Sequence, residues 1–141
     1  MPEEFDFEQS AIIPYKIEEG ELQILLITSI RQKKWIVPKG FIEFNLSPFE
    51  SAKKEAFEEA GVIGTNETFE LGAFNLNKYG GLTKIIVYSM EVEKYRDNYP
   101  EKNLRKRKWF SAKEAIETVS IPEVGEMIKT LEEKIENSQS K

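Results

Sequence analysis

Three glutamates, Glu55, Glu58 and Glu59, have the spacing at which helical side chains gather on one face. Like charges in this arrangement repel one another, and they precede Gly61 in the last turns, where the helix dipole disfavours negative charge. A divalent cation would remove both penalties. The same spacing is common on solvated helix surfaces, so the surrounding sequence has to decide between a metal site and a charged surface.

The composition leaves carboxylates as the main groups for acid–base and metal chemistry. The 141-residue chain has no cysteine and no histidine, which excludes disulfides, thiolate catalysis, histidine bases and imidazole ligands. Carboxylates suit Mg²⁺, Mn²⁺ or Ca²⁺. The net charge of −5 gives no overall indication of binding to nucleic acid or to an anionic membrane. Without an apolar signal segment or a long apolar run, a cytoplasmic protein is expected.

A helix is expected around the glutamates. Ser47 suits the N-cap, Pro48 suits the first helical position, and Glu50 completes a capping box with Ser47. Gly61 suits the position just after the last turn. A narrow face for packing on the core is formed by one aromatic and three small side chains, which are Phe49, Ala52, Ala56 and Ala60.

The remaining pattern predicts strands before this helix and both strands and helices after it. Apolar stretches bounded by turn residues indicate strands at 11–17, 21–29, 35–37, 68–76, 83–92 and 108–110. Loops are expected at 39–46 and 93–103. Ser111 with Glu114 forms a second capping box, and a final helix begins near Pro122. This order predicts one α/β (α+β) domain over residues 1–141, with flexible ends at 1–8 and 136–141.

Residues 40–62 resemble the Nudix box: glycine, five residues, glutamate, seven residues, then Arg-Glu-(aliphatic)-x-Glu-Glu-x-Gly-(aliphatic). Leu46 stands in place of the first glutamate and Lys54 in place of the arginine, which keeps the charge but loses the planar fork. The preceding residues 35–40, WIVPKG, resemble the usual lead-in. The positions that match the box are Gly40, Glu55, Ala56, Glu58, Glu59, Gly61 and Val62.

The resemblance implies a Nudix fold, in which a mixed β-sheet core is sandwiched between helices. It also implies Mg²⁺-dependent hydrolysis of a phosphoanhydride bond, with Mn²⁺ as a substitute metal. Glu55 and Glu59 would be the principal metal ligands and catalytic groups. Glu58 would be a third ligand or share the role of general base. The backbone carbonyl of Lys39 would complete the metal site, beside Gly40, which allows close approach of the backbone.

Two further stretches, 29–38 and 103–110, resemble the diphosphoinositol-polyphosphate and diadenosine-polyphosphate phosphohydrolase branch. The resemblance favours a polyphosphorylated small molecule as the partner, either a dinucleoside polyphosphate or an inositol pyrophosphate. Arginine can contact phosphate oxygens through two parallel hydrogen bonds. The alternative is that these basic residues form a solvated turn and a charged strand edge. The residues expected to bind substrate are Arg31, Lys39, Gly40, Arg105 and Arg107.

Two other functions stay open at this point. A Nudix-fold binding or sensor module with weak or no catalysis would agree with Leu46 and Lys54. An RNA 5′-end pyrophosphohydrolase would need aromatic platforms among basic residues. Tyr79 and Tyr95 could supply them, although turn and packing roles suit both residues better, and nucleic acid is not the expected partner. The sequence does not decide between a monomer and a homodimer.

Overall fold

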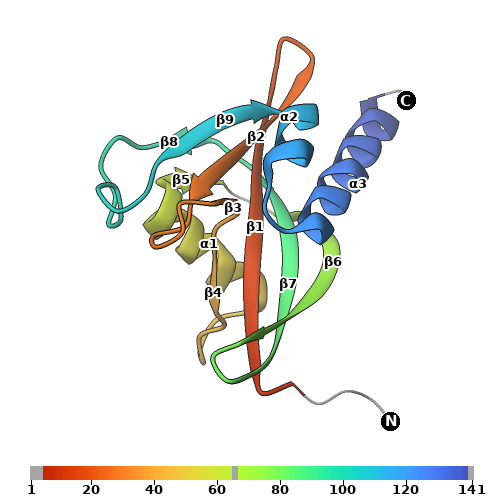
Figure 1. Cartoon of the computed structure of the whole chain (residues 1–141). Helices are drawn as coiled ribbons and strands as arrows, with labels where there is room; N and C mark the ends of the chain where they lie inside the picture. The colour runs from red at the N-terminus through yellow and green to blue at the C-terminus, as the bar shows by residue number, and fades with distance from the viewer. Residues whose placement is uncertain (1–4, 65–66, 140–141) are drawn as a thin grey trace.

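A mixed β-sheet of seven strands forms the centre of the computed structural model, which describes residues 5–64 and 67–139 (Figure 1). Its main path runs β3 (Trp35–Ile36), β2 (Glu21–Thr28), β1 (Phe7–Glu18), β7 (Gly81–Glu91) and β6 (Glu67–Lys78). Two further strands complete the sheet, β4 (Lys39–Phe41) beside β1 and β9 (Arg107–Ser111) beside β2. A separate two-stranded sheet consists of β5 (Val62–Ile63) and β8 (Lys94–Tyr95).

Strand β1 connects the two halves of the sheet. On one side it pairs in parallel with β7, from Phe7↔Thr83 to Tyr15↔Glu91. On the other side its first half pairs with β4 and its second half with β2, both antiparallel. Consequently β4, which carries Lys39 and Gly40, lies directly beside the start of the central strand.

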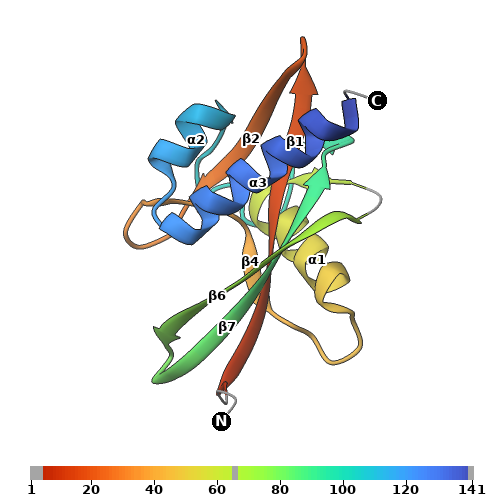
Figure 2. The same ribbon diagram turned by 90° about the vertical axis from the view of Figure 1, so that its right-hand side faces the viewer.

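Helices cover both faces of this sheet. Helix α1 (Pro48–Ala60) lies on one face, and α2 (Ala112–Thr118) and α3 (Pro122–Gln139) lie on the other (Figures 1 and 2). Successive strand side chains point to opposite faces. Ile12 therefore packs in the cluster with the alanines of α1, whereas its neighbours Ala11 and Ile13 pack with α3. The predicted sandwich of a mixed sheet between helices is confirmed.

Both ends of α1 are fixed as the sequence predicts. The Ser47 hydroxyl accepts a hydrogen bond from the Glu50 amide at 3.1 Å, and the Ser47 amide donates to the Glu50 carboxylate at 3.4 Å. Gly61 has φ +69° and donates its amide to the Phe57 carbonyl at 2.9 Å. Ala52, Ala56 and Ala60 are fully buried, so the helix packs closely on the sheet.

Three short strands were not predicted. β4 lies in the expected 39–46 loop and β8 in the expected 93–103 loop, and β5 follows α1. Each contains only two or three residues and exists through pairing with a distant strand, so no local pattern indicates it. These two loop predictions were wrong over the paired residues.

Regular structure also extends further towards the chain ends than expected. Residues 1–4 and 140–141, part of the segments expected to be flexible, lie outside the described residues. Within the described part, β1 already begins at Phe7 and α3 continues to Gln139. No helix in residues 5–64 and 67–139 combines the length and apolar character needed to cross a membrane.

Candidate active site

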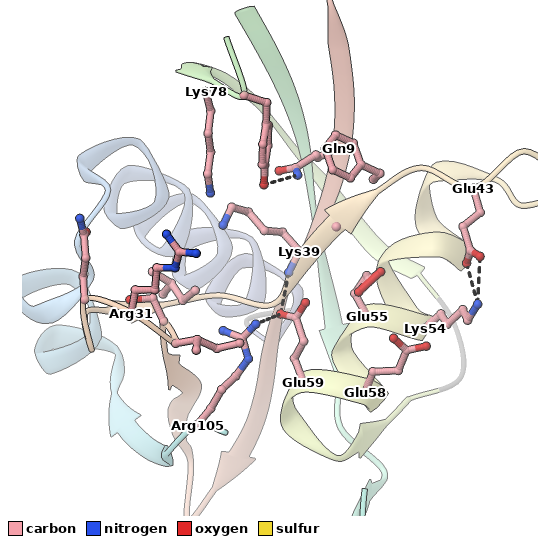
Figure 3. Close-up of a pocket in the computed structure, with 17 residues that line it drawn as sticks. Gln9, Arg31, Lys39, Glu43, Lys54, Glu55, Glu58, Glu59, Lys78 and Arg105 are labelled. Carbon is pink, nitrogen blue, oxygen red and sulfur yellow. Dashed lines mark hydrogen bonds and ion pairs between the residues drawn. The ribbon is translucent and has the colours of Figure 1, made fainter. Parts of the chain in front are cut away.

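A cavity of about 820 Å³ opens between β4, α1, the loop after β2 and the turn joining β6 to β7 (Figure 3). All the predicted site residues except Arg107 line it. They come from four separate parts of the chain, so the fold itself brings them together. The predicted residues in its lining are Arg31, Lys39, Gly40, Glu55, Glu58, Glu59 and Arg105.

Helix α1 provides the acidic wall. Glu59 is only 6% exposed, and its carboxylate accepts a hydrogen bond from the Lys39 amide at 3.3 Å. Burial, which disfavours the charged form, raises the pKa of Glu59 to about 8 and outweighs the opposing effect of Arg105. Burial also raises the pKa of Glu55, and the charge of Glu58 adds to this effect.

The acidic wall fits a hard divalent cation. The charge of Glu55 adds to the effect of burial on Glu59, so the raised pKa leaves a proton on Glu59 at neutral pH. A cation shared by the two groups would replace that proton. A Cβ added to Gly40 would overlap the Glu55 carboxyl, so this glycine lets β4 meet the carboxylate directly. The donors are all oxygen, as Mg²⁺ or Mn²⁺ prefers.

The third ligand is not already in place. Across residues 5–64 and 67–139, no three acidic side chains converge in an arrangement that would hold a metal ion. Glu58 lines the same cavity but is not gathered with the Glu55–Glu59 pair into such a group. The roles of Glu58 and of the Lys39 carbonyl as ligands therefore stay predictions.

A basic wall faces the carboxylates. Arg31, Lys39 and Lys78 project into the cavity from the loop after β2, from β4 and from the end of β6 (Figure 3). Burial lowers the pKa of Lys39, and the positive charges of Lys78 and Arg105 lower it further against the effect of Glu59. Lys78 was not predicted, because it is far from the box in sequence and lies at an ordinary turn.

Arg105 lines the cavity but is held by the protein. Its side chain donates to the Glu101 carboxylate at 3.0 Å and to the Thr28 carbonyl at 3.2 Å, and lies 3.9 Å from the Glu59 carboxylate. The side chain is only 12% exposed. These contacts leave Arg105 better placed to orient Glu59 than to reach for a substrate phosphate.

Residues 8–131 match the family model of the NUDIX domain. The chain belongs to the Nudix family. Nudix hydrolase 13, mitochondrial, of Arabidopsis thaliana is 33% identical over 109 residues, which are 70% of this chain and 54% of that protein. Diphosphoinositol polyphosphate phosphohydrolase 3-beta of Bos taurus is 35% identical over 104 residues, 72% of this chain and 62% of that protein. The chain thus spans a little over half the length of these relatives.

Solved structures show the same Nudix fold. A binary complex of Caenorhabditis elegans Ap4A hydrolase has a TM-score of 0.79 and 17% identity, covering 93% of this chain and 98% of that one. The NUDIX domain of Shewanella oneidensis NrtR, complexed with ADP ribose, has a TM-score of 0.73 and 14% identity, covering 92% and 88%. At these identities the similarity concerns the fold alone.

The two residues that differ from the Nudix box, Lys54 and Leu46, have different surroundings. The Lys54 ammonium lies 2.9 Å from the Glu43 carboxylate, so it pairs with the loop before α1. Ser51 holds the same loop, because its hydroxyl donates to the Phe41 carbonyl at 3.1 Å and accepts from the Glu43 amide at 3.2 Å. Leu46 lies away from the cavity, in a hollow that Phe57 and Met90 also line.

Arg107 is the predicted substrate-binding residue that does not line the cavity. Its guanidinium donates to the Ala60 carbonyl at 2.9 Å and stacks on the rings of Tyr95 and Tyr99, 3.6 and 4.7 Å from their centroids. The last carbonyls of a helix have no partner within the helix. Arg107 satisfies one of them, which is why it lies behind α1 and not in the cavity. The one signal in the sequence for this role is Gly61, which marks the end of α1 and therefore the carbonyls that need a partner.

Proposed function

We propose that this Nudix protein is a Mg²⁺-dependent hydrolase that cleaves a phosphoanhydride bond in a polyphosphorylated small molecule. The observation that carries the proposal is the opposition of two walls in one cavity, with Glu55 and Glu59 on one side and Arg31, Lys39 and Lys78 on the other. A phosphate chain is densely negative. Next to the acidic wall, metal cations would have to neutralise this negative charge. On the basic wall, the positive side chains already do so.

Each group in the cavity then has a task. Bound Mg²⁺ would neutralise phosphate charge and activate a water molecule. Glu55 and Glu59 would hold the metal, and Glu58 would hold it too or accept the proton of the attacking water. Arg31 and Lys78 would bind phosphate oxygens, with charge-assisted hydrogen bonds that are stronger than neutral ones. Arg105 would keep the Glu59 carboxylate in position.

The substrate class is proposed from the same features and from the relatives. One relative is named for diphosphoinositol polyphosphate and one structural neighbour for Ap4A. Both molecules carry several phosphates, as the basic wall favours. These features and names support a dinucleoside polyphosphate or an inositol pyrophosphate as the proposed substrate. The cytoplasmic location and the monomeric or homodimeric state stay predictions.

A panel of phosphoanhydrides, assayed with Mg²⁺ and with EDTA, tests the proposal. Turnover should require the metal, and Glu55→Gln or Glu59→Gln should abolish it while the fold is retained. Glu126→Gln, an equal charge change on the exposed side of α3, should behave as wild type. Wild-type turnover in both active-site variants would place the metal site elsewhere. Ligand binding without turnover in the wild type would instead favour a sensor module.

A further inference from the structure

An aromatic cluster borders the cavity. Phe7, Phe41 and Tyr79 contact one another, with ring centroids 6.1, 5.9 and 5.0 Å apart. Phe41 and Tyr79 line the cavity and are nevertheless 46% and 50% exposed. Large aromatic rings left half in water retain apolar surface that a flat ligand could cover.

The backbone at Tyr79 is unusual for this residue. Tyr79 and Gly80 form the two-residue turn between β6 and β7, with φ values of +59° and +76°. Such hairpin turns strongly favour Asn, Asp or Gly, and a bulky side chain at positive φ is strained. The local backbone would therefore favour asparagine over tyrosine at position 79.

A buried amide lies beneath the cluster. Gln9 is 3% exposed, lines the same cavity, and donates through Nε2 to the Tyr79 hydroxyl at 3.4 Å. Its Oε1 atom is buried and has no hydrogen-bond partner among the described residues. Exchanging the amide oxygen and nitrogen would only move the unmet group to the other atom. A buried polar atom without a hydrogen-bond partner costs free energy. A ligand that moves the tyrosine ring could supply that partner.

We infer that Phe41, Tyr79 and Gln9 form a subsite for a nucleobase of the substrate. Aromatic rings stack on the flat face of any base, and a glutamine amide can hydrogen-bond to a base edge. A saturated inositol ring with charged substituents gains little from either group. The inference rests on the proposed hydrolase function and narrows its substrate to a nucleoside polyphosphate.

Steady-state kinetics on two probes test the subsite. The probes are diadenosine tetraphosphate and phosphoribosyl diphosphate, which has a diphosphate but no base. Tyr79→Asn and Phe41→Ala should raise KM for the first probe about tenfold more than for the second, equivalent to about 1.4 kcal/mol. Tyr79→Phe, which keeps the ring, should retain most of the affinity. Phe44→Ala removes a fully exposed ring outside the cavity lining and should change neither KM.

Thermal melting separates a binding role from a structural one. Tyr79→Asn should keep or raise Tm, because asparagine relieves the turn, while binding of the base is lost. A fall in Tm with equal kinetic losses on both probes would show that the ring only packs. Equal losses at unchanged Tm, or none, would also overturn the subsite and leave the hydrolase function intact.

A binding experiment keeps the two proposals distinguishable. ADP and inorganic pyrophosphate are titrated calorimetrically into Glu59→Gln and into Glu59→Gln combined with Tyr79→Asn. If the double variant binds ADP more weakly but binds pyrophosphate as before, the subsite is supported. This holds even if the wild type hydrolyses neither kinetic probe. Equal weakening of both ligands, or the absence of any preference for ADP over pyrophosphate, overturns it.

Discussion

Glu59 shows at the scale of one residue how the site is prepared for a cation. Its carboxyl is buried beside Glu55, which disfavours the charged form. The nearby Arg105 and the Lys39 amide favour the charged form and offset this effect only in part. Burial prevails, so the pKa lies near 8 and the group holds a proton at neutral pH. Metal binding must displace that proton, and apparent Mg²⁺ affinity should therefore increase as the pH rises towards about 8.

The same pKa predicts how stability depends on pH without metal. Because the folded pKa of about 8 exceeds the ordinary value of 4.5, Glu59 contributes stability below the ordinary value that is lost as the pH rises through 8. Glu59→Gln does not titrate. In EDTA the variant should melt higher than wild type at alkaline pH, and the difference should shrink towards acidic pH.

Thermal melts across this pH range, with and without Mg²⁺, measure the effect. Added Mg²⁺ should raise the Tm of the wild type much more than that of Glu59→Gln, because only the wild type keeps both ligands. Glu126→Gln is the control for a change of one charge at the surface. Parallel pH curves for wild type and Glu59→Gln would contradict the raised pKa.

At the scale of elements, the segment after β8 holds the end of helix α1, which carries the three glutamates. The Glu101 amide donates to the Glu58 carbonyl at 2.9 Å, and the Arg96 amide donates to the Gly61 carbonyl at 2.8 Å. Arg107 donates to the Ala60 carbonyl between them. The carbonyls around the acidic wall are thus fixed by a segment that does not itself enter the cavity, apart from Arg105.

Arg107→Ala should loosen this end of the helix. Leaving the Ala60 carbonyl without its partner should lower the free energy of unfolding by about 1–3 kcal/mol. Turnover and Mg²⁺ affinity should fall with little change in KM, because the residue contacts the helix and not the cavity. Lys106→Ala, an equal charge change on an exposed neighbouring side chain, should be near neutral. A rise in KM alone would point back to a substrate contact.

Gly40→Ala tests the close contact between β4 and α1. The new methyl group would overlap the Glu55 carboxyl, so the carboxyl must move and Mg²⁺-dependent turnover should drop. The drop should be at least about tenfold, since positioning errors of this size are costly in catalysis. Circular dichroism should show a retained fold. Gly125→Ala, in α3 on the other face of the sheet, should leave turnover unchanged, and equal activity in both would contradict the role of Gly40.

What the sequence predicts correctly is mostly local. The capping boxes at Ser47 and Ser111 are readable from neighbouring residues, and both form as expected. β4, β5 and β8 depend on partners far along the chain, so they were missed. The contact of Arg107 with the end of α1 was missed for the same reason, because only the fold brings the two together. Phe41 and Tyr79 meet only once β6 and β7 have joined β1.

At the scale of the whole molecule, charge is distributed unevenly. The chain carries a net charge of −5, yet Arg31, Lys39 and Lys78 gather in one cavity. The overall charge repels a polyanion, whereas the local charge attracts it. Arg105, which the sequence suggested as a phosphate contact, is occupied by Glu101, Thr28 and Glu59, so the dependence on phosphate number should follow Arg31 and Lys78 instead.

Arg31→Ala and Lys78→Ala should therefore raise KM more for substrates with more phosphates. Each lost charge-assisted contact is worth roughly 1.5–3 kcal/mol, or about tenfold or more in KM. Kinetics on a series of increasing phosphate number, repeated at low and high salt, would measure this. Lys129→Ala, on the exposed surface of α3, is the control. An equal effect along the whole series would show that these side chains do not contact the additional phosphates.

The parallel ladder between β1 and β7 has a consequence for how the protein folds. It joins Phe7 to Thr83 and Tyr15 to Glu91, so the central pairing closes a loop that contains most of the first half of the chain, including α1. Closing so long a loop early in folding carries a large entropic penalty, and proteins rich in such distant pairings fold slowly. Fragments separated after α1 should not fold alone, whereas co-expressed halves that can restore the ladder should regain a folded protein together.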